Sequence, residues 1–191
     1  RRALRNVLLR YLTSDDDATA AEIADAHYRA ATNMTDMIAG LASLTRMESL
    51  KRQAAFDHFH DRFQNDPLVL DKWLSLQAGS CLPQTAERVR GLREKIDMKN
   101  PNRVRSLVGA FAGNHVRFHA ADGSGYALVG ETIRAVDSIN PQVSSRMAGA
   151  FETWRRYDAK RQALMRGELE SMLKIDGISA NLFEVATKML G

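Results

Sequence analysis

The side chains with the greatest potential for chemistry in this sequence are its histidines, a single cysteine and several arginines. A catalytic zinc site built on one helix needs two imidazoles on the same face and a carboxylate that activates water. None of the five histidines, which are His27, His58, His60, His115 and His119, is followed by glutamate, so the H-E-x-x-H pattern is absent. We therefore expect no metal site and no catalytic residue among these residues.

The histidines that lie close together in the sequence are also poorly placed for a shared metal ion. His58 and His60 are two residues apart on a predicted helix, and side chains at this spacing point to different faces. His115 and His119 could be joined by Asp122, but this set has no fourth ligand and no recognised spacing. We expect the loop "FHAADGSGY", which contains His119 and Asp122, to be structural, with its glycines allowing a tight turn and Asp122 or Ser124 capping the next helix.

The remaining candidates for catalysis or ligand binding are equally weak. Cys81 lies in "AGSCLP" without a histidine nearby in the sequence, so we interpret it as a structural thiol. The aspartates of "TSDDDATAAE", residues 13 to 22, lack the glycine and the later glutamate of a calcium loop, and we expect them to cap a helix. No phosphate-binding glycine motif occurs.

Arginines at the borders of two apolar helix faces offer a binding function instead. Arg103 and Arg105 flank the expected buried stripe of a helix from Pro101, and Arg146 lies at the edge of the stripe of a helix from Pro141. The expected stripes are Val104, Leu107, Val108 and Phe111 on the first helix and Val143, Met147, Phe151 and Trp154 on the second. Such arginines either cover apolar surface with their stems or face a groove, where a guanidinium can bind a carboxylate through two hydrogen bonds. The spacing leaves both alternatives open.

The elements that position these side chains are predicted to be helices throughout. Apolar residues recur three and four positions apart along almost the whole chain, and we expect about eleven helices. The predicted segments are 2–12, 17–31, 33–46, 48–65, 67–78, 84–97, 101–112, 124–138, 141–156, 158–174 and 180–190.

Three of these helices begin with an Asx-Pro pair, in which Asp66, Asn100 or Asn140 would cap a helix that opens with proline. The prolines follow one another at intervals of 34 and 40 residues, which are the lengths of one helix pair in tetratricopeptide and in HEAT or armadillo arrays. We therefore predict an all-α fold, an irregular superhelix of antiparallel helix pairs, with an irregular all-α globule as the alternative.

Composition narrows the functional classes. With 191 residues, the chain is long enough for one helical domain, residues 1–191, and no apolar stretch is long enough to span a membrane. The net charge of +4 arises from basic residues scattered among acidic ones, so we do not expect nucleic-acid binding. A single cysteine favours a reducing, cytoplasmic location. The chain starts with Arg1 inside an amphipathic pattern, and we expect it to be a piece of a longer polypeptide.

Several sequence segments resemble the C-terminal helical region of the bacterial aminopeptidase N family, whose members are zinc metallopeptidases. These segments are "NPNRVRSLVGAFAGN", "FHAADGSGY", "NPQVSSRM" and "RRYDAKRQALMRGELE", and the resemblance extends over essentially the entire chain. It implies an irregular superhelix of paired helices that closes over an active site built by other domains. The zinc ligands, the general base and the groups that hold the substrate's free amine would belong to those domains, which this sequence lacks.

The resemblance also implies roles for two arginines. The second arginine of "NPNRVRSL" is Arg105, and the single arginine of "NPQVSSRM" is Arg146. By their places in the family's segments, both would project toward an internal chamber that holds short peptides. The expected function is a non-catalytic C-terminal lid that controls substrate access, without peptidase activity or cofactor of its own. Its expected partners are the other domains of the parent enzyme and short peptides. The alternative is a free-standing helical-repeat module that binds another protein.

Overall fold

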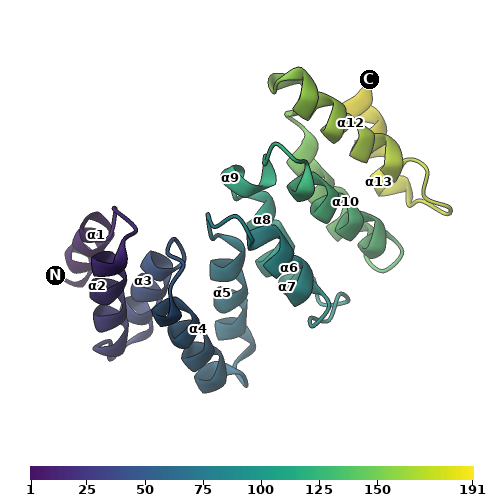
Figure 1. The fold of residues 1–191 in the computed structure, drawn as a ribbon. Coiled ribbons are helices and arrows are strands. Elements are labelled where there is room, and N and C mark those ends of the chain that lie inside the picture. Colours follow the sequence, from purple (N-terminus) through teal and green to yellow (C-terminus); the bar gives the residue numbers. More distant parts are fainter. The chain divides into compact units, whose positions relative to one another are not determined.

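The computed structural model describes all 191 residues, and every regular element in it is a helix (Figure 1). The predicted all-α class is therefore confirmed. The chain divides into two compact units, Arg1–Leu82 and Pro83–Gly191, which are described separately below. The expectation of one domain over residues 1–191 stays a prediction. None of the helices combines the length and apolar composition that a bilayer crossing requires.

The first unit consists of five α-helices whose positions agree with the predicted segments to within a few residues. Their bounds are α1 (Arg2–Leu12), α2 (Ala18–Arg29), α3 (Met34–Leu44), α4 (Leu50–Phe63) and α5 (Pro67–Ala78). Asp17 caps α2 by accepting the amide of Ala20, and Asp66 caps α5 by accepting the amides of Leu68 and Val69. Both caps are those expected from the sequence.

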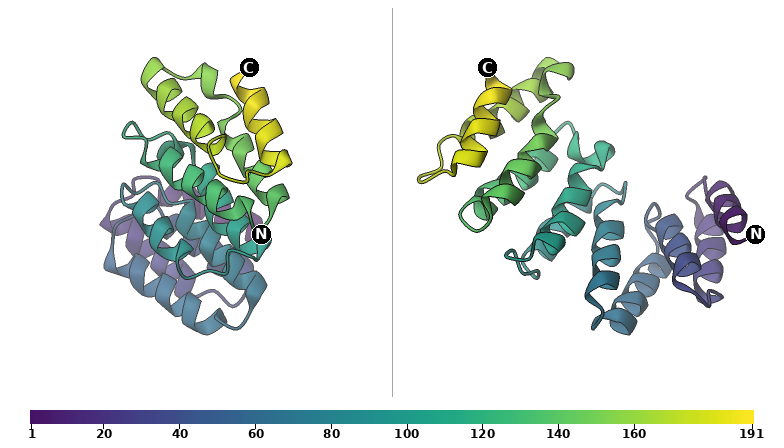
Figure 2. Two further views of the ribbon diagram at one scale, coloured as in Figure 1. Left: turned by 90° about the vertical axis from the view of Figure 1, so that its right-hand side faces the viewer. Right: turned by 180° about the vertical axis from the view of Figure 1, so that it is seen from behind.

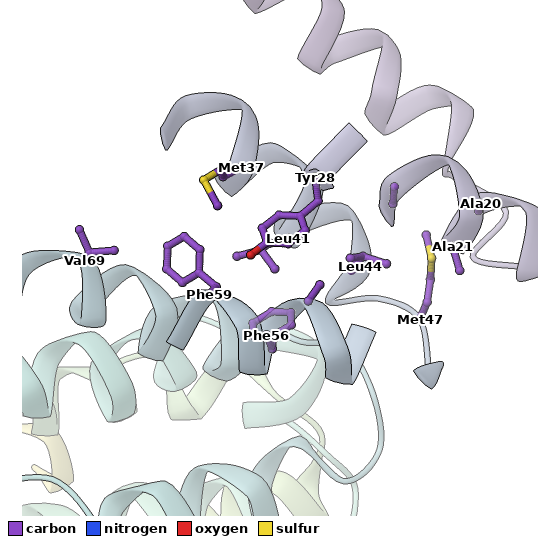
Figure 3. Close-up of a cluster of buried hydrophobic side chains, with 12 residues drawn as sticks. Ala20, Ala21, Tyr28, Met37, Leu41, Leu44, Met47, Phe56, Phe59 and Val69 are labelled. Carbon is purple, nitrogen blue, oxygen red and sulfur yellow. The ribbon is translucent and has the colours of Figure 1, made fainter. Parts of the chain in front are cut away.

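The core of the first unit is aromatic and aliphatic, and it lies where α2, α3 and α4 meet (Figure 3). Leu41, Phe56 and Phe59 are completely buried, and Tyr28 is 1% exposed. Gly40 allows α2 and α3 to approach closely, because a Cβ atom at this position would lie 2.8 Å from the Cβ atom of Tyr28. The tight core therefore depends on a residue without a side chain.

The second unit combines α-helices with π- and 3-10-helical turns. Its α-helices are α6 (Thr85–Arg93), α7 (Pro101–Val104), α8 (Ala110–Ala112), α9 (His115–Phe118), α10 (Ser124–Asp137), α11 (Pro141–Ala148), α12 (Ala159–Met172) and α13 (Ala180–Leu190). A π-helical turn, Arg105–Gly109, joins α7 to α8, and 3-10 turns follow α11 at Gly149–Phe151 and Trp154–Arg156.

Three of the predicted segments in this unit need correction. The predicted helix 141–156 ends as an α-helix at Ala148 and continues as 3-10 turns, and the predicted helix 84–97 ends at Arg93. The expected long loop after residue 112 contains the short helix α9. Apolar spacing does not report where the backbone tightens from α to 3-10 geometry.

Consecutive helices in the second unit pack against each other, α10 with α11 and α12 with α13, and α11 also packs against α13. In both views of Figure 2, α12 and α13 lie side by side near the C-terminus. Arg134 of α10 donates to Glu168 of α12 at 2.7 Å and ties these two helices together. The pairing of consecutive helices agrees with the predicted repeat architecture.

Candidate functional site

A pocket of about 440 Å³ lies in the second unit, and both arginines singled out in the sequence line it. Arg105 comes from the first residue of the π-helical turn after α7, and Arg146 comes from α11. Between them, the apolar part of the pocket wall is formed by Ala112, Val143, Met147 and Ala150. The structure thus brings together two residues that are 41 positions apart in the sequence.

Arg105 is held by a well-anchored segment. Asn100 caps α7 by accepting the amides of Asn102 and Arg103, as predicted. The four residues of the expected stripe, Val104, Leu107, Val108 and Phe111, are all completely buried. The π-helical turn places one extra residue in the helix at this point, a geometry that occurs frequently at functional sites. The buried stripe therefore fixes the backbone while Arg105 stays exposed.

The face of α11 differs from the prediction. Val143 and Met147 were expected to be buried, but they are only half-buried and line the pocket. Ser144 and Ala148 are the buried residues instead, and the Ser144 hydroxyl donates to the carbonyl of Ile133 at 3.2 Å. A serine satisfied by a backbone carbonyl can occupy a core position, which hydrophobic spacing alone does not reveal. As a result, the apolar face next to Arg146 is open to a ligand.

Neither pocket arginine has an ionic or hydrogen-bonding partner within the chain. Two other arginines of this unit do have one: Arg134 binds Glu168 at 2.7 Å, and Arg161 binds Asp158 at 2.6 Å. No acidic residue lines the pocket, so its two guanidinium groups carry uncompensated positive charge. Planar guanidinium groups bind carboxylates through paired, charge-assisted hydrogen bonds.

Two glycines keep the pocket open. Gly109 and Gly113 belong to its lining, and a Cβ atom at Gly113 would meet only two backbone oxygens, at 3.5 and 3.9 Å. At Gly109 a Cβ atom would lie 3.4 Å from the Cγ atom of Arg105. Small residues therefore line the same side of the pocket as Arg105.

The loop that contains His119 is held by side-chain contacts with two tyrosines. The Nδ1 atom of His119 lies 2.8 Å from the Tyr126 hydroxyl, and its Nε2 atom lies 2.8 Å from the Tyr157 hydroxyl. Burial, together with the charges of His115 and Arg161, lowers the pKa of His119 from its ordinary value of 6.5. Gly123 adopts φ +78°, which confirms the tight turn, and Asp122 accepts the amide of Ser124.

The donor atoms present do not form a zinc site. Both ring nitrogens of His119 are engaged by tyrosines, and no three His, Cys, Asp or Glu side chains gather as a metal would require. His58 contacts Tyr28 at 2.7 Å, whereas His60 packs against Trp73, so the two histidines face different neighbours as predicted.

A second cluster of arginines, which the sequence analysis missed, lies in the first unit around Asp36. This carboxylate is 2% exposed, binds Arg5, and accepts hydrogen bonds from Asn6 at 3.1 Å and Asn33 at 2.8 Å. The bond from Asn33 and then that from Asn6, aided by the charges of Arg5 and Arg2, hold the pKa of Asp36 below its ordinary value. The available signal was Asn33 as N-cap with an acid three residues later.

The complete chain, residues 1–191, matches the family described as "Domain of unknown function (DUF3458_C) ARM repeats". The chain therefore belongs to this family of armadillo-repeat domains, which agrees with the predicted fold class.

The chain is also similar to the C-terminal part of bacterial proteins named aminopeptidase N. It is 40% identical over its full length to the protein of Caulobacter vibrioides and 41% identical to that of Escherichia coli. It spans only 22% of the length of each of these relatives. This similarity confirms the resemblance seen in the sequence.

A solved structure supports the same relationship. The Legionella pneumophila aminopeptidase A, crystallised in complex with aspartic acid, matches 99% of this chain with a TM-score of 0.91 and 31% sequence identity. The match covers 23% of that longer chain. The present chain thus corresponds to a helical part of larger aminopeptidases.

Proposed function

We propose that this chain is a non-catalytic lid of a cytoplasmic zinc aminopeptidase, where it controls the access of short peptides to a catalytic centre formed by other parts of the parent protein. The names of the relatives and the small share of their length that the chain spans support this assignment. In this proposal the chain has no peptidase activity by itself, and zinc belongs to the rest of the parent protein.

The observation that carries the proposal is the pair of unpartnered arginines on one pocket. Arg105 and Arg146 would bind the carboxylate end of a peptide whose amino end is processed elsewhere. Charge-assisted hydrogen bonds contribute about 1.5–3 kcal/mol when water is excluded, and less at exposed side chains such as these. The arginines therefore favour peptide binding without taking part in bond cleavage.

The test compares two kinds of substrate in the full-length protein that contains this chain. We expect Arg105→Ala and Arg146→Ala each to raise KM for short peptides about three- to tenfold, the equivalent of about 0.7–1.4 kcal/mol. Turnover of a single-residue anilide, which has no peptide carboxylate, should be unchanged.

The matched control is Arg156→Ala. Arg156 is also exposed and unpartnered in the second unit, but it does not line the pocket. This variant should resemble the wild type on both substrates. Equal losses on peptide and anilide in the two pocket variants would remove the proposed role.

A free-standing protein-interaction module is the second candidate, and the exposed apolar face of α1 favours it. Leu4, Leu8 and Tyr11 are 63%, 50% and 74% exposed, which is unusual for residues of this size. The coding sequence that precedes Arg1 separates the two functions. An H-E-x-x-H motif followed by a glutamate favours the aminopeptidase part, whereas a start codon immediately before the codon of Arg1 favours the module.

A further inference from the structure

The two arginines are sufficient to bind a carboxylate, so the apolar wall of the pocket in the second unit is available to another group of the ligand. Val143 and Met147 are half-buried, and with Ala112 and Ala150 they present hydrocarbon surface beside the two arginines. The volume of about 440 Å³ lies within the range of pockets that enclose small organic groups, roughly 300–1,000 Å³. A ligand that uses the whole site must therefore combine a negative charge with an apolar group.

We propose that this pocket recognises the last residue of a peptide: Arg105 and Arg146 hold its α-carboxylate while its apolar side chain enters the space between Ala112, Val143 and Met147. The inference rests on the proposed function and adds a preference for the residue at the peptide's carboxyl end. The α-carboxylate and the side chain branch from the same Cα atom. A carboxylate held by the arginines consequently brings the side chain next to the apolar wall.

Other anions match the pocket less well. Phosphate and nucleic acid are bound by many donors, but the only side chains with polar donors in this lining are the two guanidinium groups. The nearest helix start offers little help, because Pro141 has no amide hydrogen and Asn140 accepts the amide of Val143. Burying an apolar side chain contributes about 25 cal/mol for each Å² removed from water, so the wall adds affinity only for an apolar residue.

The experiment uses the full-length protein and a set of peptides that differ only in their last residue, which is leucine, asparagine or glycine. A fourth peptide ends in leucine amide and lacks the terminal charge. We expect KM for the leucine peptide to be about tenfold lower than for the asparagine and glycine peptides, with similar kcat. Nα-acetylated versions, tested as inhibitors, should show the same order of Ki without depending on turnover.

Filling the pocket should abolish this preference. In Gly113→Leu the new side chain would occupy the pocket from a position where a Cβ atom meets only ordinary contacts. We expect the leucine preference to fall below threefold while amidation still weakens binding, because the arginines remain. Ala150→Leu fills the same pocket from another element, the 3-10 turn Gly149–Phe151, and repeats the test if Gly113→Leu does not fold.

The matched control is Gly149→Leu. Gly149 is exposed, a Cβ atom there meets nothing within 4 Å, and the residue does not line the pocket. This variant should keep the full leucine preference.

The possible results separate the two proposals. If amidation weakens binding but the last side chain has no effect, the further inference is overturned and the proposed function stands. If neither amidation nor the last residue matters, both are overturned. A leucine preference that survives in both filled variants also overturns the inference, since another surface would then provide it.

Discussion

The hollow around Asp36 in the first unit and the Arg105 and Arg146 pocket in the second both contain arginines, but they differ in how the charge is compensated. In the first unit Asp36 binds Arg5 and two asparagines, whereas no acidic residue faces the pocket of the second unit. A buried charge that is fully paired is needed by the fold, because removal of one partner leaves the other charge buried without compensation. A charge left without a partner at a pocket is available to a ligand. The same residue type is therefore structural in one unit and a binding candidate in the other.

Gly40 in the core of the first unit and Gly113 at the pocket of the second differ in the space around them, and this contrast predicts the largest effect on stability. Gly40→Ala should lower the free energy of unfolding by about 1–3 kcal/mol, because the new Cβ atom would overlap with the backbone and Cβ atom of Tyr28. Gly113→Ala should instead leave stability unchanged or raise it by about 0.4–1 kcal/mol, since its surroundings are open. Urea unfolding of the two variants measures the difference. Equal destabilisation would mean that the pocket is as tightly packed as the core.

Polar contacts in the second unit that lie away from the pocket should stabilise the fold without affecting peptide binding. Tyr157→Phe removes the hydroxyl that contacts His119 and should cost about 1 kcal/mol, with no change in peptide KM.

The lowered pKa of His119 makes the free energy of unfolding depend on pH. Its pKa is lowered in the folded protein, so the unfolded chain takes up the proton more readily. The stability that His119 contributes is present above pH 6.5 and is lost as the pH falls through the lower folded value. Thermal unfolding between neutral and mildly acidic pH should show this loss, and in His119→Gln the corresponding part of the slope should be absent.

The smallest effect is expected for the pocket arginines themselves. Arg105→Ala and Arg146→Ala should each change the free energy of unfolding by less than about 0.5 kcal/mol, because both side chains are exposed and form no bond within the chain. Urea unfolding of these variants measures their effect on stability, which is then compared with their effect on KM for peptides. A loss as large as that of Gly40→Ala would assign the arginines to the fold and weaken the contrast between the two units.

Much of the fold was accessible from the sequence because its signals are local. Asn100 and Asn140 cap the helices that begin at Pro101 and Pro141, and the stripe from Val104 to Phe111 is buried as predicted. The apolar period failed on α11, where Ser144 rather than Met147 enters the core. That exchange depends on the Ile133 carbonyl of another helix, and no pattern within residues 141–148 records it.

The sequence alone determined the helical class and the caps, since caps and apolar periods act over one or two turns. Apolar spacing left Arg103, Arg105 and Arg146 as candidates, and the family resemblance selected Arg105 and Arg146. Only the tertiary structure placed Arg105 and Arg146 on one pocket, left them without an acidic partner and turned Val143 and Met147 toward it. These properties depend on contacts between segments that are distant in the sequence. The pairing of charges and the volume of the pocket are set by those contacts, so they are determined only when the helices pack.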